Sequence, residues 1–186
     1  MVFFINFILK KKNLANKKDR PKYLVLKKWD NFEIRQYEPR IIAQITIQND
    51  FEQAIKEGFN LLAAYIFGQN ATKAKIAMTA PIEQREDATK KHWLIAFSMP
   101  TKYKLSELPY PKDPRITLKQ IEKQKRAALV FSGFCTEKKA AQNTNLLLDL
   151  IEQHGYTPIG PCILARYDPP WTLPCFRHNE LLFVIN

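Results

Sequence analysis

The last 21 residues, Arg166 to Asn186, hold the densest group of side chains that could bind a ligand. Asp168-Pro169-Pro170 ends an apolar run, because proline donates no backbone hydrogen bond and fixes φ. Leu181 to Ile185 is a second apolar run, short enough for a strand that is buried on both faces. Between the two runs lie aromatic, basic and polar residues, namely Trp171, Phe176, Arg177, His178, Asn179 and Glu180.

Two interpretations of this loop are open. Pro169, Pro170 and Pro174 stiffen it, and its composition suits a flat apolar ligand that carries acidic groups. The alternative is an ordinary loop whose Trp171 and Phe176 pack into the core. Composition alone favours the ordinary loop, since loops commonly carry such residues without a function.

Length and cysteine content bound the class of protein. A chain of 186 residues with 46% hydrophobic residues is large enough for one domain with a substantial core. Cys135, Cys162 and Cys175 are an odd number without a CxxC pair or zinc-finger spacing. They predict reduced thiols, and therefore a cytoplasmic protein rather than a disulfide-linked secreted one.

The basic charge is concentrated at the N-terminus. Residues 1–28 carry nine basic residues and one acidic residue, a net charge of +8 out of +11, so the other 158 residues carry only +3. Such a tail can hold acidic lipids or RNA without specificity, or it can be a solvated arm. We therefore expect no specific nucleic-acid partner, a basic arm over 1–20 and a single monomeric domain over 21–186.

The apolar stretch Val2 to Leu9 is far shorter than the roughly 20 residues that a membrane-spanning helix needs. It lacks the features of a secretory signal, because the lysines follow the apolar residues instead of preceding them. If it contacts a membrane, residues 1–12 would lie in the interface with Lys10–Lys12 at the headgroups. Peripheral membrane contact is therefore an alternative to a free arm.

Periodicity predicts two helices among short strands. Asp50 caps a helix in which Gln53 completes a motif close to a capping box, and Gly68 ends it. Its apolar face consists of Phe51, Ile55, Phe59, Leu62 and Ile66. A second helix runs from Thr136 to about Gln153. Strands are predicted over 23–28, 32–37, 41–47, 74–80, 92–99, 116–121, 126–132, 162–165 and 181–185.

An internal duplication organises these elements. The order strand, helix, strand, strand occurs twice, at an offset of about 85 residues. Arg40-Ile41-Ile42-Ala43 corresponds to Arg126-Ala127-Ala128-Leu129, and Asn60-Leu61-Leu62 corresponds to Asn145-Leu146-Leu147. Two such halves predict an α+β fold, a distorted antiparallel β-barrel with pseudo-twofold symmetry and one helix outside each half.

Several motifs together resemble the SOUL haem-binding family over about residues 23–186. They are FEIRQYEP at 32–39, KIAMTAPI at 75–82, RYDPP at 166–170 and RHNEL at 177–181. The resemblance implies a barrel of eight to nine strands with two helices. It also implies a protein that binds or carries haem or a related tetrapyrrole without being an enzyme.

The resemblance further implies a groove between the first helix and the loop before the last strand. Lys56 and Arg177 would hold the propionates, and Phe59 and Trp171 would cover the ring. By position, the groove consists of Lys56, Phe59, Ala63, Trp171, Thr172, Arg177 and His178. His178 is the histidine nearest to this groove and the candidate iron ligand, because Gln36 occupies the position of a histidine proposed as ligand in some family members.

Other interpretations remain. The two-repeat plan also resembles effector-binding domains of bacterial transcription factors, which suggests a barrel that sequesters another flat hydrophobic or cationic molecule. Glu180 is then the candidate counter-charge, unless it pairs with Arg177 or Arg166. As an enzyme, the protein could use Glu180 as an acid beside Tyr167, but no nucleophile elbow, metal triad or phosphate loop occurs.

Overall fold

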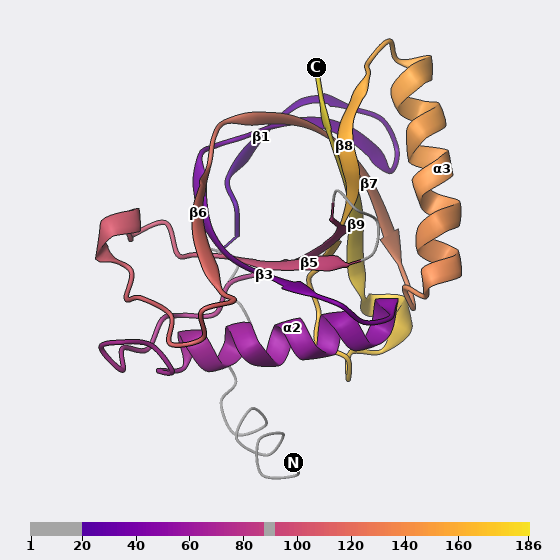
Figure 1. The fold of residues 1–186 in the computed structure, drawn as a ribbon. Helices are drawn as coiled ribbons and strands as arrows, with labels where there is room; N and C mark the ends of the chain where they lie inside the picture. The colour runs from indigo at the N-terminus through magenta and orange to yellow at the C-terminus, as the bar shows by residue number, and fades with distance from the viewer. Residues whose placement is uncertain (1–19, 88–91) are drawn as a thin grey trace.

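A computed structural model describes residues 20–87 and 92–186, and the arm predicted over 1–20 lies almost wholly outside them. The described chain forms one curled antiparallel sheet of nine strands in the order β1-β2-β7-β9-β8-β4-β5-β3-β6, with two helices outside it (Figure 1). None of the described helices is long and apolar enough to cross a membrane. The strands are β1 (Tyr23–Lys28), β2 (Phe32–Tyr37), β3 (Arg40–Ile47), β4 (Ile82–Glu86), β5 (Trp93–Ser98), β6 (Thr117–Ile121), β7 (Gln124–Ser132), β8 (Pro158–Arg166) and β9 (His178–Ile185).

Helix α2 (Phe51–Ile66) begins and ends as its sequence predicts. The Asp50 side chain accepts a 2.8 Å hydrogen bond from the backbone N–H of Gln53. The predicted capping box is not completed by Gln53, because the backbone N–H of Asp50 donates to the side chain of Asn49 instead. Gly68, at φ +111°, follows the helix in a conformation that favours glycine. The second helix, α3 (Glu137–Gln153), is capped by Thr136.

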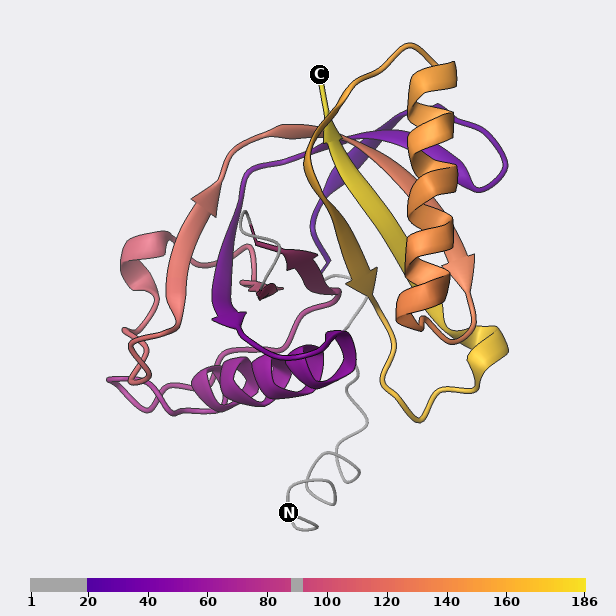
Figure 2. The ribbon, with the colours of Figure 1, turned by 45° about the vertical axis from the view of Figure 1, so that its right-hand side comes forward.

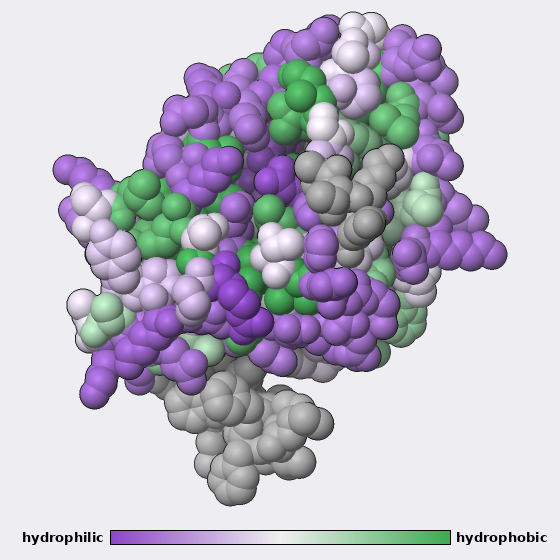
Figure 3. Space-filling model, viewed as in Figure 1, coloured by the Kyte–Doolittle hydropathy of each residue, from purple (hydrophilic) through white to green (hydrophobic). Residues whose placement is uncertain are grey.

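Both helices cover the outer, convex face of the sheet (Figure 2). Helix α2 packs on β3 and β5, whereas α3 packs on β7, β8 and β9. Each helix buries an apolar side against its strands, and the opposite side of α2 is hydrophilic (Figure 3). The two larger apolar cores therefore lie between the sheet and the helices, and a smaller cluster of Ala128, Ile163, Ala165 and Leu182 lies on the inner face of the sheet.

The inner, concave face of the sheet also carries buried charged residues. In β2, Phe32 and Ile34 face the helix side, while Glu33, Arg35 and Tyr37 alternate with them. The alternation of apolar and polar residues over 32–37 predicts a half-buried strand, and this prediction is wrong, because both faces of β2 are buried and Arg35 is only 2% exposed. Both faces of β2 are buried because the sheet is curved: the helices cover its outer face, and the other strands of the curled sheet enclose its inner, polar face.

The predicted strand over 74–80 is wrong, and the strand lies later, at β4. Residues 74–80 are held by isolated bonds instead: the Ile76 N–H donates to the carbonyl of Ile66, and the Thr79 hydroxyl donates to the carbonyl of Ser98. The duplication is confirmed, since β3-α2-β4-β5 and β7-α3-β8-β9 have the same order. The predicted α+β barrel with two helices is confirmed as well, with nine strands in a curled, incompletely closed sheet.

Candidate functional site

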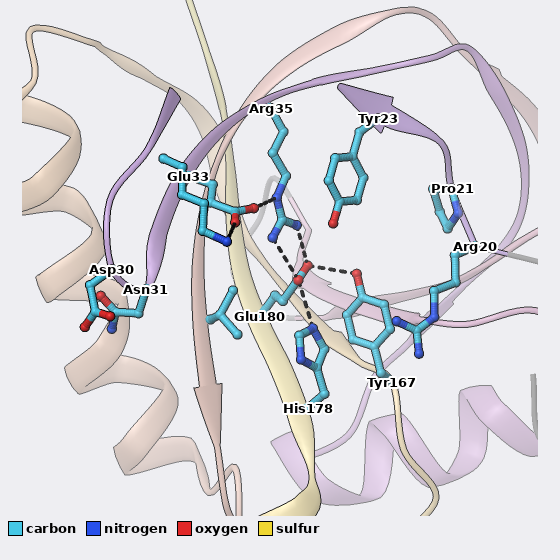
Figure 4. A pocket seen from close by; sticks show the side chains of 12 residues that line it. Arg20, Pro21, Tyr23, Asp30, Asn31, Glu33, Arg35, Tyr167, His178 and Glu180 are labelled. Carbon is cyan, nitrogen blue, oxygen red and sulfur yellow. Dashed lines mark hydrogen bonds and ion pairs between the residues drawn. The ribbon is translucent and has the colours of Figure 1, made fainter. Parts of the chain in front are cut away.

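A cavity of about 360 Å³ opens on the concave face of the sheet (Figure 4). Strands β1, β2 and β9 supply most of its wall, and the end of β8 leads into Tyr167. Its volume lies within the range of about 300–1,000 Å³ that small-molecule sites occupy. The side chains that define its polar floor are Tyr23, Glu33, Arg35, Tyr167, His178 and Glu180.

Arg35 and Glu180 form a two-bond clamp across the floor. The Arg35 Nη1 and Nη2 atoms donate to the two carboxylate oxygens of Glu180 at 2.9 and 3.1 Å. Strand β7 lies between β2 and β9, so the guanidinium must reach across it. The small side chain of Ala128, which is opposite Glu33 and Leu182, leaves room for this crossing. Both members of the pair are 2% exposed.

Glu180 is also bound by Tyr167 and His178. The Tyr167 hydroxyl donates to Oε2 at 2.8 Å, and His178 Nε2 lies 2.9 Å from Oε1. Burial raises the pKa of Glu180, but the hydrogen bonds from His178 and Arg35 outweigh burial and lower that pKa to about 2. A carboxylate that is ionised accepts only, so Nε2 of His178 is the donor in this contact.

Aromatic rings and cations complete the cavity. The Arg35 guanidinium lies 4.4 Å from the ring centre of Tyr23, and the Arg20 guanidinium lies 4.9 Å from that of Tyr167. Burial, followed by the nearby charge of Glu180, raises the pKa of Tyr167 well above its ordinary value. Glu33 accepts from Arg35 at 2.7 Å and also pairs with Lys28. The three cations and three carboxylates in the lining balance when His178 is neutral.

The helix members of the predicted groove lie on α2, outside this cavity. Lys56 is exposed, whereas Phe59 is half-buried and lies 5.7 Å from Phe97, measured between ring centres. Ala63 is buried at 6% exposure and faces the core. Of the three, Lys56 is the one that is fully free to meet a ligand at the surface.

The loop members are held in a rigid segment before β9. The Arg177 Nε donates to the Thr172 carbonyl at 2.8 Å, its Nη2 donates to the Pro170 carbonyl, and the guanidinium lies 4.7 Å from the Phe134 ring centre. The views of Figures 1 and 2 place the start of this loop beside the N-terminal end of α2. Arg166 links the two, since it pairs with Glu52 at 3.7 Å.

The His178 imidazole is directed to the inner cavity rather than to the outer surface of the loop. Its ring points at Glu180 on the floor of the cavity (Figure 4), whereas Trp171 is 52% exposed at the surface. His154 caps α3, where its Nδ1 lies 2.8 Å from the Leu150 carbonyl oxygen. No group of three or more metal-binding side chains occurs within residues 20–87 and 92–186.

Two expectations about this region are wrong. Trp171 and Phe176 are 52% and 73% exposed, so they do not pack into the core as an ordinary loop would require. The partner of Glu180 is neither Arg177 nor Arg166 but Arg35, which lies 145 positions earlier in the chain. The sequence signal was present in the alternation of Glu33, Arg35 and Tyr37, which placed three polar groups on one face.

The comparisons with known proteins agree with this fold. The chain is 28% identical over 165 residues to Heme-binding protein 1 of Xenopus laevis, covering 83% of this chain and 84% of that protein. It is 26% identical over 168 residues to Heme-binding protein 2 of Mus musculus, covering 83% and 78%. The crystal structure of the EcmrR C-terminal domain matches with a TM-score of 0.65 at 13% identity, covering 88% of this chain and 98% of that one, which indicates a shared fold. The model of the SOUL heme-binding protein family matches residues 18–184, and the chain therefore belongs to that family.

Proposed function

We propose that this protein binds and carries haem or a related tetrapyrrole, without catalysis, on the loop before β9. The observation that supports this proposal is an exposed apolar surface on a rigid loop. Trp171, Leu173 and Phe176 are 52%, 63% and 73% exposed, and Phe134 beside Arg177 is 59% exposed. Soluble proteins rarely display so many large apolar side chains together unless they bind something.

The residues present fit the chemistry of a tetrapyrrole. Its flat face requires aromatic and aliphatic surface, and its propionates require cations at the edge. Lys56 is an exposed cation on α2, the helix whose N-terminal end lies beside the loop. Arg177 is already hydrogen-bonded to Thr172 and Pro170, so it supplies positive charge at a fixed position. When bound, the group supplies its own iron chemistry, and the chain supplies the surface and the counter-charges.

His178 remains the proposed iron ligand: its Nε2 faces the inner cavity, but 38% of the side chain is exposed and the residue directly follows Arg177 of the outer loop. Metal-ligating histidines usually donate their other ring N–H to a carboxylate, which fixes the ring and raises its basicity. Nε2 of His178 is the donor to Glu180, which leaves the lone pair of Nδ1 for a metal. Among the described residues, Nδ1 has no hydrogen-bond partner, whereas Gln36 offers only a weakly coordinating amide.

A binding role is also favoured over hydrolysis at Glu180. A general acid must hold a proton near neutral pH, but the pKa of Glu180 is about 2. The Tyr167 hydroxyl is equally unsuited to act as a base, since its pKa lies well above its ordinary value. The pair is therefore better described as a fixed electrostatic scaffold.

The proposal is tested by titrating haemin into the wild type and following the Soret absorbance. Leu173→Ser/Phe176→Ser should weaken binding at least tenfold, because two exposed apolar side chains are lost. Leu105→Ser/Tyr110→Ser is the matched control, since these residues are 41% and 82% exposed elsewhere. Equal affinity of the loop variant and the control would refute the proposed surface.

Charge and ligation are tested separately. Lys56→Glu should weaken haemin binding more at low than at high salt, with Lys112→Glu as the control. Arg177→Glu is a poorer test, because it also removes the bonds that hold the loop. His178→Ala should change the Soret position, and an unchanged spectrum would exclude His178 as the ligand.

The inner cavity favours a second candidate, an effector-type barrel that sequesters another flat molecule. Two tyrosine rings and a volume of about 360 Å³ would accommodate one aromatic ligand. Because Arg35 neutralises Glu180, an uncharged ligand suits this cavity better than a cation does. Tyr23→Ala should weaken binding in the cavity and leave haemin binding on the outer loop unchanged.

Membrane contact through residues 1–12, the cytoplasmic location and the monomeric state remain predictions.

A further inference from the structure

A second group of charges on the concave face contains one more buried cation than anion. Glu83 accepts from Arg40 at 2.6 Å and from Arg126 at 3.3 Å. The three residues are 8%, 7% and 3% exposed, respectively. One carboxylate therefore serves two guanidiniums, which leaves one buried positive charge uncompensated. Such a charge is costly without a counter-ion.

Arg40 and Arg126 occupy corresponding positions in the two repeats, at the start of β3 and near the start of β7. Burial lowers the pKa of Arg126, and the like charge of Arg40 lowers it further against the opposing effect of Glu83. Among the described residues, the Arg126 Nε and Nη2 atoms are hydrogen-bonded only to the neutral side chain of Gln124, at 3.2 and 2.9 Å. The Arg40 Nε is buried without a partner among the described residues.

These groups line a cavity of about 50 Å³, separate from the larger one. Arg85, half-buried on β4, adds a third guanidinium to its lining, and the side chain makes no hydrogen bond or ion pair with a described residue. The lining thus contains three cations and one anion. Apart from Gln124, its remaining wall is apolar and consists of Ile42, Leu94, Ala96, Ile121, Ile163 and Val184.

We propose that this cavity is a binding site for a small monocarboxylate with a short apolar tail. The carboxylate would accept from Arg85 and the inner guanidiniums, and the tail would lie against Ile121, Val184 and their neighbours. The volume corresponds to roughly three or four waters, which suits one carboxylate and a few methylene groups. The buried surplus is a single charge, so a monoanion matches it better than a phosphate dianion. A porphyrin is far too large for this space.

The probes are acetate, butyrate and hexanoate, added to the full chain at constant ionic strength. Binding is measured by calorimetry and by the rise in Tm that a ligand of the native state causes. Butyrate should bind saturably and more tightly than acetate, because its tail buries additional apolar surface. Butyramide, which has the same shape without the charge, should not bind. Equal binding of butyramide, or binding of inorganic phosphate as tight as that of butyrate, would overturn the proposal.

Two substitutions identify the site. Arg85→Gln should weaken butyrate binding about tenfold, since it removes one charge-assisted donor. Gln124→Glu places a carboxylate beside the Arg126 guanidinium, where it supplies the missing negative charge. The variant should therefore have a higher Tm without ligand, and butyrate should no longer raise that Tm. Gln120→Glu, an exposed change of the same charge on β6, is the control.

Unchanged butyrate affinity in Gln124→Glu would overturn the proposal. If that variant does not fold, Arg85→Gln decides alone, because no described hydrogen bond or ion pair depends on the Arg85 side chain. An affinity of Arg85→Gln equal to that of the wild type would then be the refuting result. The outcome is independent of haemin, which is absent from every sample.

Discussion

Replacing Arg35 by methionine should be among the most damaging single changes in the molecule. Methionine has a similar length but leaves the carboxylate of Glu180, which is 2% exposed, without its cation. Removing one partner of a buried ion pair typically costs about 3–5 kcal/mol. For a chain of this size, that corresponds to a fall in Tm of roughly 6–20 °C.

The pH dependence gives an independent estimate of the same interaction. The folded protein lowers the pKa of Glu180 from 4.5 to about 2, which corresponds to about 3 kcal/mol of stability. Because the folded pKa is depressed, this stability is fully present above pH 4.5 and is lost as the pH falls from 4.5 toward 2. In Arg35→Met, Glu180 loses the charge and hydrogen bonds of Arg35 but keeps those from His178 and Tyr167, so its pKa should rise toward the ordinary value. The difference between variant and wild type should therefore shrink by up to about 1 kcal/mol at pH 3.5.

Urea unfolding at pH 7 and pH 3.5, followed by circular dichroism, measures both quantities. Arg35→Met/Glu180→Met should recover most of the loss, because an apolar pair of similar volume replaces the ion pair. Arg115→Met, which breaks the exposed pair with Asp113, should have no measurable effect. A cost below about 1 kcal/mol at pH 7, or an equal cost at both pH values, would refute the reasoning.

Three further predictions concern stability. Gly58→Ala should cost about 1–3 kcal/mol in urea unfolding, since the new methyl group would lie 2.5 Å from Ile95 Cγ1, and trimming Ile95 to alanine in the same chain should recover part of it. The wild type should lose stability as the pH falls from 4.5 to 2, because Glu83 also has a folded pKa of about 2, and Glu83→Gln should flatten an acid titration followed by fluorescence. Asp50→Ala should cost about 1 kcal/mol by thermal unfolding, because the N-cap of α2 is lost, and no change would contradict the assigned cap.

Local signals in the sequence were sufficient for the helices and the repeat. Asp50, Gly68 and the apolar stripe of α2 act within one or two turns of chain, so they can be recognised without knowledge of the fold. Strand β4 was missed because it reads IEQRE and has a single apolar residue. Its Glu83 is buried because it pairs with arginines from other strands. The hydrophobic periodicity of a sequence does not indicate a buried residue of this kind.

The site was predictable in composition but not in its contacts. The sequence indicated a binding loop with Trp171, Arg177 and His178, and it indicated Tyr167 as a neighbour of Glu180, which the structure confirms. The pairing of Arg35 with Glu180 depends on the register of β2 and β9 across β7. Register over such a sequence separation is a property of the assembled sheet, so a single sequence could not reveal it.

The narrowest point of the sheet is the junction between β4 and β8. It contains three residue pairs, Ile82 with Arg166, Glu83 with Ala165 and Gln84 with Leu164, whereas every other strand pairing contains five to seven. Helix α2 packs mainly on one side of this junction and α3 on the other. The two halves of the sheet are therefore joined by few backbone pairs, and the ion pair of Arg126 with Glu83 crosses between them. A ligand that contacts both halves would add a cross-link at the place where the sheet itself supplies the fewest.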